Sequence, residues 1–78
     1  MKKLEQISYS EIGKMGLPIL FGKLDHLKVG EGFKLLNFPS YQEMRELTSE
    51  VEPHLHQDYI FRRVIDENNL TYSVRRVK

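Results

Sequence analysis

The chain contains no cysteine among its 78 residues. This absence excludes disulfide bridges, thiol nucleophiles, thiolate zinc sites and iron–sulfur clusters. A single domain of this size buries only somewhat over ~60% of its unfolded surface, so we expect one modest core held together by packing alone. A deep substrate cleft is not expected in such a protein.

Long hydrophobic runs are missing as well. The longest apolar run, residues 17–21, contains Pro18 and is far shorter than a membrane span. Lys2 and Lys3 are followed by a polar stretch and not by the apolar region of a signal peptide. We therefore expect no membrane association and a cytoplasmic location, which would be that of the host cell if the protein is phage-encoded.

Neither sign of charge predominates. Twelve Lys and Arg against eleven Asp and Glu give a net charge of +1, so the chain has no general attraction to nucleic acid or to anionic lipid. Four of the basic residues nevertheless form two pairs, Arg62/Arg63 and Arg75/Arg76, close to the end of the sequence. The distribution of charge is therefore more informative than its sum.

Residues 59–78 have the pattern of a β-hairpin. The asparagines of segment 66–69 tolerate the positive φ that tight turns require. A turn centred on Asn68 and Asn69 places Arg62 opposite Arg75 on one face. The other face is then mostly apolar, and we expect a helix to pack on it; it carries Tyr59, Phe61, Ile65, Leu70, Tyr72 and Val74.

The clearest helix signal begins at Ser40. Ser40 and Glu43 have the spacing of a capping box, in which Ser40 accepts from the Glu43 amide and Glu43 reaches back to the Ser40 amide. Pro53 is expected to end or kink the helix. Apolar residues then recur at intervals of three and four, which predicts one buried stripe consisting of Tyr41, Met44, Leu47, Val51 and Leu55.

The first half of the chain gives weaker signals. Segment 29–32 predicts a turn into a strand over residues 33–38, and Pro18 makes segment 17–21 an edge segment or an apolar plug. Residues 1–16 form an N-terminal segment compatible with a short helix after Ser8 or Ser10. The predicted fold class is α+β: over residues 17–78, a three-stranded antiparallel sheet in β-α-β-β order, packed by one amphipathic helix.

The arginines allow two interpretations of equal weight. Arginine binds phosphates through its fixed fork of donors, so the hairpin could carry a phosphate-binding patch. Its candidate residues are Arg62, Arg63, Arg75, Arg76, Lys78 and Lys34. The other interpretation is that they are ordinary strand residues paired with helix acids. Base stacking gives little support to nucleic-acid binding, because the aromatic residues of the hairpin belong to the predicted core side.

No reaction chemistry is indicated. His54, His56 and Asp58 alternate in a way that could converge on one ion, but a polar linker whose histidines cap helix carbonyls is the favoured interpretation. No acid, base and nucleophile converge in the sequence. We expect no metal, no cofactor and no enzymatic activity.

Four short segments resemble a small domain often encoded by bacteriophages: residues 21–24, 27–33, 61–64 and 74–78. The resemblance covers residues 21–78 and implies a strand with a Val-Gly-Glu-x-Phe opening, a helix and a closing hairpin. The family is mostly uncharacterised, and nucleic-acid binding is commonly presumed for it. This chain departs at Leu20, where proline is common, at Gly32, where serine is common, and in its acidic helix.

Two functional hypotheses of different class follow. The first is a small nucleic-acid-binding protein that grips phosphates through the terminal hairpin. The alternative is an effector that docks on a host enzyme or defence complex and modulates or inhibits it, through the hairpin edge or through Glu43, Glu46 and Glu50. Homodimerisation through an exposed sheet edge stays open.

Overall fold

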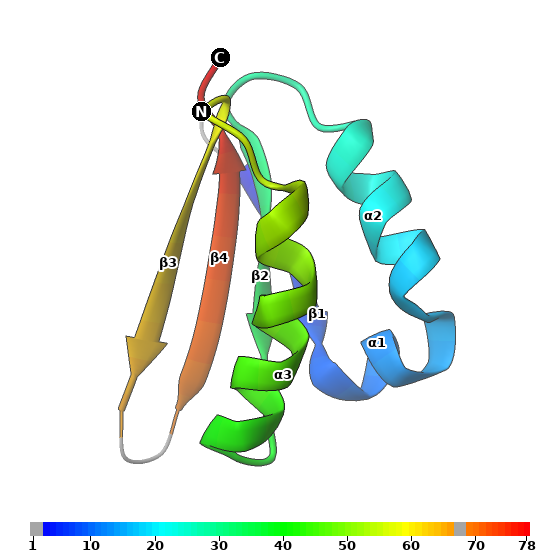
Figure 1. Cartoon of the computed structure of the whole chain (residues 1–78), viewed down its shortest axis with the longest axis vertical. Helices are drawn as coiled ribbons and strands as arrows, with labels where there is room; N and C mark the ends of the chain where they lie inside the picture. Colours follow the sequence, from blue (N-terminus) through cyan, green and yellow to red (C-terminus); the bar gives the residue numbers. More distant parts are fainter. Residues whose placement is uncertain (1–2, 67–68) are drawn as a thin grey trace.

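The computed structural model describes residues 3–66 and 69–78. Its strands form one sheet in the order β1-β2-β4-β3, and the helices pack against one face of that sheet (Figure 1). The α+β class is thereby confirmed. The elements are β1 (Lys3–Ser8), α1 (Tyr9–Met15), α2 (Leu17–Asp25), β2 (Glu31–Leu36), α3 (Tyr41–Val51), the 3-10 turn η1 (Glu52–His54), β3 (Tyr59–Ile65) and β4 (Leu70–Arg76).

The sheet has four strands and is mixed, so the prediction of three antiparallel strands was partly wrong. The additional strand is β1, which runs parallel to β2 with Ile7 beside Leu35. Parallel neighbours need a crossover connection, and α1 and α2 provide it. This strand was hard to recognise from its residues, because Ile7 is its only buried side chain among those described.

The helix expected after Ser8 is present as α1. The Ser8 amide donates to Glu11 Oε2 at 3.0 Å, which satisfies one of the free N–H groups at the start of the helix. Ile7 and Ile12 are both buried in the common core. Residues 3–16 thus supply a strand and a helix to the same sheet and core as the rest of the chain.

Segment 17–21 is helical, which corrects the prediction of an edge segment or plug. Pro18 lies in the first turn of α2, where a backbone N–H would have no partner within the helix, so proline is tolerated there. Gly16, with φ of 85°, separates α1 from α2. Leu20 and Leu24 then reach the core from one side of α2.

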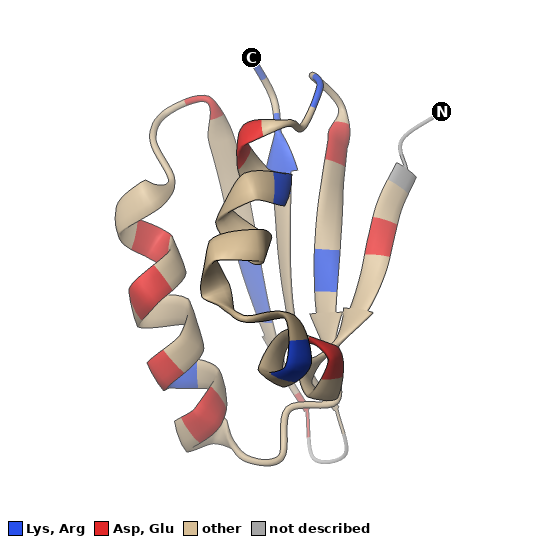
Figure 2. Ribbon diagram, turned by 90° about the vertical axis from the view of Figure 1, so that its right-hand side faces the viewer, with Lys and Arg blue, Asp and Glu red and all other residues tan. Residues whose placement is uncertain are grey.

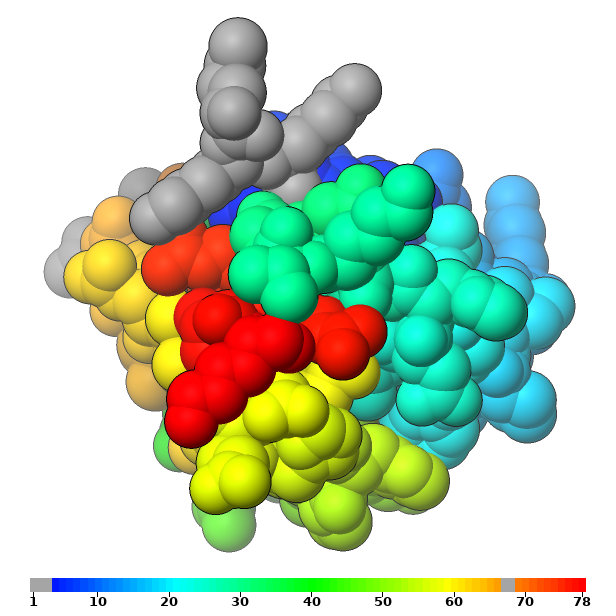
Figure 3. All heavy atoms as spheres, turned by 90° about the horizontal axis from the view of Figure 1, so that it is seen from above, coloured from blue at the N-terminus to red at the C-terminus, as the bar shows by residue number. Residues whose placement is uncertain are grey.

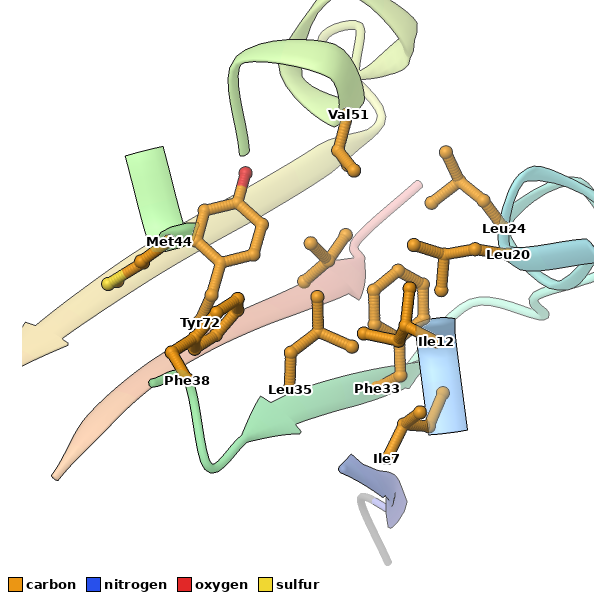
Figure 4. Close-up of a cluster of buried hydrophobic side chains, with 11 residues drawn as sticks. Ile7, Ile12, Leu20, Leu24, Phe33, Leu35, Phe38, Met44, Val51 and Tyr72 are labelled. Atoms are coloured by element: carbon orange, nitrogen blue, oxygen red, sulfur yellow. The ribbon is translucent and has the colours of Figure 1, made fainter. Parts of the chain in front are cut away.

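The core lies between the helices and the covered face of the sheet (Figure 4). The central strands β2 and β4 contribute the largest side chains to it, and α3 closes it with Met44, Thr48 and Val51. Tyr41, predicted in the helix stripe, is 46% exposed instead. The buried hydrophobic residues are Ile7, Ile12, Leu20, Leu24, Phe33, Leu35, Phe38, Met44, Val51, Tyr72 and Val74.

The predicted limits of α3 are confirmed. Ser40 Oγ accepts from the Glu43 amide at 3.3 Å, and η1, which contains Pro53, follows Val51. The Glu43 carboxylate, however, accepts from Ser40 Oγ at 2.6 Å and not from the Ser40 amide as predicted. No helix in residues 3–66 or 69–78 is long and apolar enough to cross a membrane.

The terminal hairpin is confirmed, but its register differs from the prediction by two residues. Asp66 and Asn69 exchange backbone hydrogen bonds of 3.0 and 3.3 Å, and Arg62 therefore faces Ser73 while Arg75 faces Ile60. Arg62 and Arg75 are therefore diagonal neighbours, and not directly opposite each other as was predicted. The greater distance between them lowers the repulsion between their charges. Because the shift is even, each side chain keeps its predicted face. Asn68, half of the predicted turn centre, lies outside the described residues.

Candidate functional site

The face of the sheet that no helix covers is the main candidate site. Side chains alternate between the two faces along each strand, so the residues opposite the core belong to this face. None of its positions is acidic. They are Leu4, Gln6 and Ser8 of β1, Gly32, Lys34 and Leu36 of β2, Thr71, Ser73 and Arg75 of β4, and Ile60, Arg62 and Val64 of β3.

Three predicted site residues come together on this uncovered face. Lys34 and Arg62 lie in one row across the sheet, on either side of Ser73, and Arg75 lies in the next row. Arg75 is thus a diagonal neighbour of both, and diagonal Cα atoms in a sheet are roughly 7–8 Å apart. The three cationic side chains can therefore contact one extended anion together.

The charges of these three residues are not neutralised within the described part of the chain. No ion pair or side-chain hydrogen bond is formed there by Lys34, Arg62 or Arg75, whereas Arg63, Lys23 and Arg76 all have such partners. A hollow of about 250 Å³ is bordered by Leu4, Ile60, Phe61, Arg62, Ser73 and Arg75. The site is therefore shallow, basic and rimmed by aliphatic side chains.

Gly32 allows the central strands to approach closely at this site. A Cβ atom at Gly32 would lie 2.0 Å from the Val74 carbonyl oxygen and 2.8 Å from Leu4 Cδ2. Leu4 instead covers the glycine, and Gly32 is buried although it carries no side chain. Sequence reasoning missed this role of Leu4, because its strand was not recognised.

Arg63 is separated from the basic face. It belongs to the helix-covered side, where its guanidinium donates to Glu52 Oε2, and this hydrogen bond raises the pKa of Arg63. Arg63 also borders a polar hollow of about 400 Å³ between α3 and β3, with Arg45, Glu46 and Ser49. Arg63 is paired with Glu52. It therefore fits the second interpretation, in which the arginines are strand residues paired with acidic residues of the same chain.

Arg76 holds the chain end in place. Its Nη1 donates to the Leu27 carbonyl and its Nε to the Lys78 carbonyl, each at 2.8 Å. Figure 3 shows the chain end beside the loop before β2 and the segment before β3, and the Val77 amide donates to the Asp58 carbonyl at 2.7 Å. Arg76 therefore has a structural role, and Lys78 is exposed beside it.

The predicted acidic residues gather on α3, away from the uncovered face (Figure 2). Glu43 is engaged by the Ser40 cap, and Glu46 accepts from Gln42 Nε2 at 3.3 Å. Glu50 is exposed. The acidic residues of α3 and the group formed by Lys34, Arg62 and Arg75 therefore lie on different sides of the molecule.

The histidines of the proposed linker make separate aromatic contacts. The His54 ring lies 4.1 Å from the Phe21 ring, and the His56 ring lies 4.9 Å from the Tyr59 ring, centroid to centroid. His56 Nδ1 accepts from the Asp58 amide at 3.4 Å. Within residues 3–66 and 69–78, no three His, Asp or Glu side chains are grouped to hold a metal ion.

Tyr72 has the most perturbed ionisation. Its hydroxyl is buried, and no described residue hydrogen-bonds to it. Burial raises the pKa of this phenol far above its ordinary value of 10.0, and the nearby negative charge of Glu52 raises it further. A neutral, enclosed phenol of this kind belongs to the core and offers no chemistry to a ligand.

Comparisons with known proteins add no identification. Scans against family models, curated proteins and solved structures find no match to this chain. The resemblance to a phage-type domain therefore stays a prediction.

Proposed function

We propose that this protein binds nucleic acid through the uncovered face of its sheet. The observation that carries the proposal is the grouping of Lys34, Arg62 and Arg75 among strand positions of which none is acidic. Unpaired cations close together attract the phosphate backbone and gain from releasing its counterions. Arginine adds directional, bidentate contacts to phosphate oxygens.

The composition of the face favours phosphate contacts over base readout. Its remaining side chains are aliphatic or small and polar, and the aromatic residues Phe61 and Tyr72 belong to the other side. Phe61 is exposed on the edge strand, but alternation places it on the other side, so no strand position of this face offers an aromatic ring on which a base can stack. The proposed binding is therefore weakly dependent on sequence, and the bacteriophage resemblance is compatible with such a role.

The test is binding of labelled duplex DNA, single-stranded DNA and RNA across a salt series. The triple variant Lys34→Ala/Arg62→Ala/Arg75→Ala should weaken binding to every ligand that the wild type binds. If each cation neutralises one phosphate, the slope of log K against log salt should become shallower by roughly 2 to 3.

A matched control removes the same charge elsewhere. Lys14→Ala/Lys28→Ala/Arg45→Ala neutralises three exposed cations outside the uncovered face. The control should retain most of the affinity. Equal losses in the two variants would mean that only net charge matters, and absence of wild-type binding at low salt would refute the proposal.

The second candidate function is a protein-binding effector that modulates a host enzyme. It is favoured by the outer surface of α3, where acidic residues gather (Figure 2) and where Glu46 and Glu50 are exposed. Such a surface suits electrostatic docking on a basic partner. In a nuclease-treated lysate, a stoichiometric partner lost in Glu46→Lys/Glu50→Lys but kept in the triple variant would favour this function.

A further inference from the structure

Strand β3 is the edge of the sheet and has an unusual amount of exposed apolar surface. Ile60, Phe61, Val64 and Ile65 are 48%, 47%, 41% and 59% exposed, and they occupy both faces of the strand. The strand is seven residues long and contains neither proline nor glycine. A long apolar edge strand of this kind favours pairing with another strand.

The free backbone groups of β3 can be assigned from the hairpin. Asp66 and Asn69 exchange two hydrogen bonds, and the Asp58 carbonyl accepts from Val77, so the even-numbered residues of β3 point their backbone groups at β4. In an antiparallel pair the intervening residues point the other way. The N–H and C=O groups of Phe61, Arg63 and Ile65 therefore face outward from the sheet.

The opposite edge of the sheet differs. Strand β1 exposes Glu5 and Gln6, and Glu5 forms an ion pair of 3.1 Å with Lys23 of α2. Charged and polar side chains on an edge discourage pairing with another chain. Among the described residues, β1 exposes one large apolar side chain, Leu4 at 38%, whereas β3 exposes four.

We propose that β3 pairs in antiparallel fashion with β3 of a second copy of this chain. The two-fold axis passes through Arg62, perpendicular to the sheet, so that each face of one sheet continues into the same face of the other. Ile60 then lies opposite Val64 of the second copy. Tyr59 lies opposite Ile65, and Phe61 opposite Arg63, of the second copy.

The strand is its own complement in this register. Both members of each pair lie on the same face, and all seven residues take part. Moving the axis to Phe61 or Arg63 shortens the paired segment and leaves outward N–H groups unbonded. The one unfavourable pair, Arg62 with itself, extends from the uncovered face into solvent. This inference does not rest on nucleic-acid binding, because it concerns the strand edge.

Single cysteines test the register directly, since the native chain has none. In the proposed pair, the two residues at position 62 are directly opposite and not hydrogen-bonded, with Cα atoms about 4.5 Å apart, which suits a disulfide. Residues at position 60 or 64 would be about 13 Å or more from their own copies. We therefore expect Arg62→Cys to form covalent dimers at least about tenfold faster than Ile60→Cys or Val64→Cys under mild oxidation.

Proline scanning provides the second measurement. Ile65→Pro removes an outward N–H without disturbing the β3–β4 hydrogen bonds, and Ile65→Thr is the matched control that keeps this N–H. In sedimentation equilibrium, we expect the dimer dissociation constant of Ile65→Pro to be at least about tenfold weaker than that of Ile65→Thr. Circular dichroism checks that both variants are folded.

Three results would overturn the proposal. One is a wild-type chain that stays monomeric up to about 1 mM. Another is equal cross-linking rates at positions 60, 62 and 64, which would indicate random collision. The third is a monomer whose β3 amides become protected from exchange only when another protein is added, which would assign the edge to a foreign strand.

Discussion

Strands β3 and β4 are neighbours of equal length, and each carries an arginine pair, yet their environments differ. In β4, Tyr72 and Val74 are fully buried, whereas every side chain of β3 after Tyr59 is exposed. The more apolar of the two strands, with Ile60, Phe61, Val64 and Ile65, is the one left at the edge. Position in the sheet, and not hydrophobicity, decided which strand was buried.

The reason lies in the path of α3. Met44, Thr48 and Val51 of this helix are buried in the core that Tyr72 and Val74 share, while the strand outside β4 remains uncovered. An apolar strand that its own chain does not cover is a surface for another molecule. The buried side chains of β4 therefore hold the fold together, whereas the exposed side chains of β3 are free to bind.

The largest test of this difference compares two aromatic residues. Tyr72→Ala should lower the free energy of unfolding by about 3–5 kcal/mol, because it opens a cavity in the core. Phe61→Ala should cost only about 1 kcal/mol, since Phe61 is already 47% exposed. Urea denaturation at low protein concentration measures both. Equal losses would show that β3 is covered in the monomer.

A second test concerns glycine in the central strand β2. Gly32→Ala should destabilise the fold by about 1–3 kcal/mol, because its Cβ would meet the Val74 carbonyl at 2.0 Å. The control Gly22→Ala lies within α2, where a Cβ would meet nothing within 4 Å, and should stabilise by about 0.5–1 kcal/mol. Thermal or urea unfolding of both variants measures these changes. A Gly32→Ala variant as stable as the wild type would contradict the close approach of the two strands.

A third test separates the neighbouring arginines of β3. Arg63→Ala breaks the pair with Glu52 and should cost up to about 1 kcal/mol, since both side chains are partly exposed. Arg62→Ala should leave the free energy of unfolding nearly unchanged, yet weaken nucleic-acid binding. The reverse pattern, in which Arg62 matters for stability and Arg63 for binding, would contradict the assignment of Arg62 to the binding face and of Arg63 to the helix-covered face.

The smallest effect is expected from Tyr72→Phe. Removing a buried hydroxyl without a hydrogen-bond partner should leave stability near pH 7 unchanged or slightly higher. Its raised pKa means that, above about pH 10, the unfolded chain loses this proton while the folded chain keeps it, so wild-type stability should fall as pH rises. Denaturation from pH 7 to 11 should show a smaller fall in Tyr72→Phe, and identical profiles would contradict this.

The parts predicted correctly from sequence depend on local signals. Ser40 and Pro53 delimit α3, Ser8 precedes α1, and the alternation in residues 59–76 separates Arg62 and Arg75 from the core side. The hairpin register was missed by two residues because the turn signal lay one position away from the true turn. The faces survived this error, since an even shift preserves alternation.

Other features escaped prediction because they depend on contacts distant in sequence. Strand β1 is defined by its pairing with β2. The helix over residues 17–25 was missed for a local reason, because Pro18 was interpreted as a sign of an edge segment and not of a first helical turn. Arg63 and Arg76 resemble Arg62 and Arg75 in sequence, but Glu52 and the Leu27 carbonyl engage only the former two. Sequence alone therefore could not separate Arg63 and Arg76, which have partners within the protein, from Arg62 and Arg75.

The sequence by itself determined the α+β class, the limits of α3, the terminal hairpin and the face on which each hairpin side chain lies, because caps, prolines and alternation act over a few residues. Only the tertiary structure decided the strand order, the exposure of β3 and the grouping of Lys34 with Arg62 and Arg75 on one uncovered face. These features arise when α1 and α2 carry the chain back to a parallel neighbour and α3 covers one half of the sheet, and no local signal encodes such long-range packing.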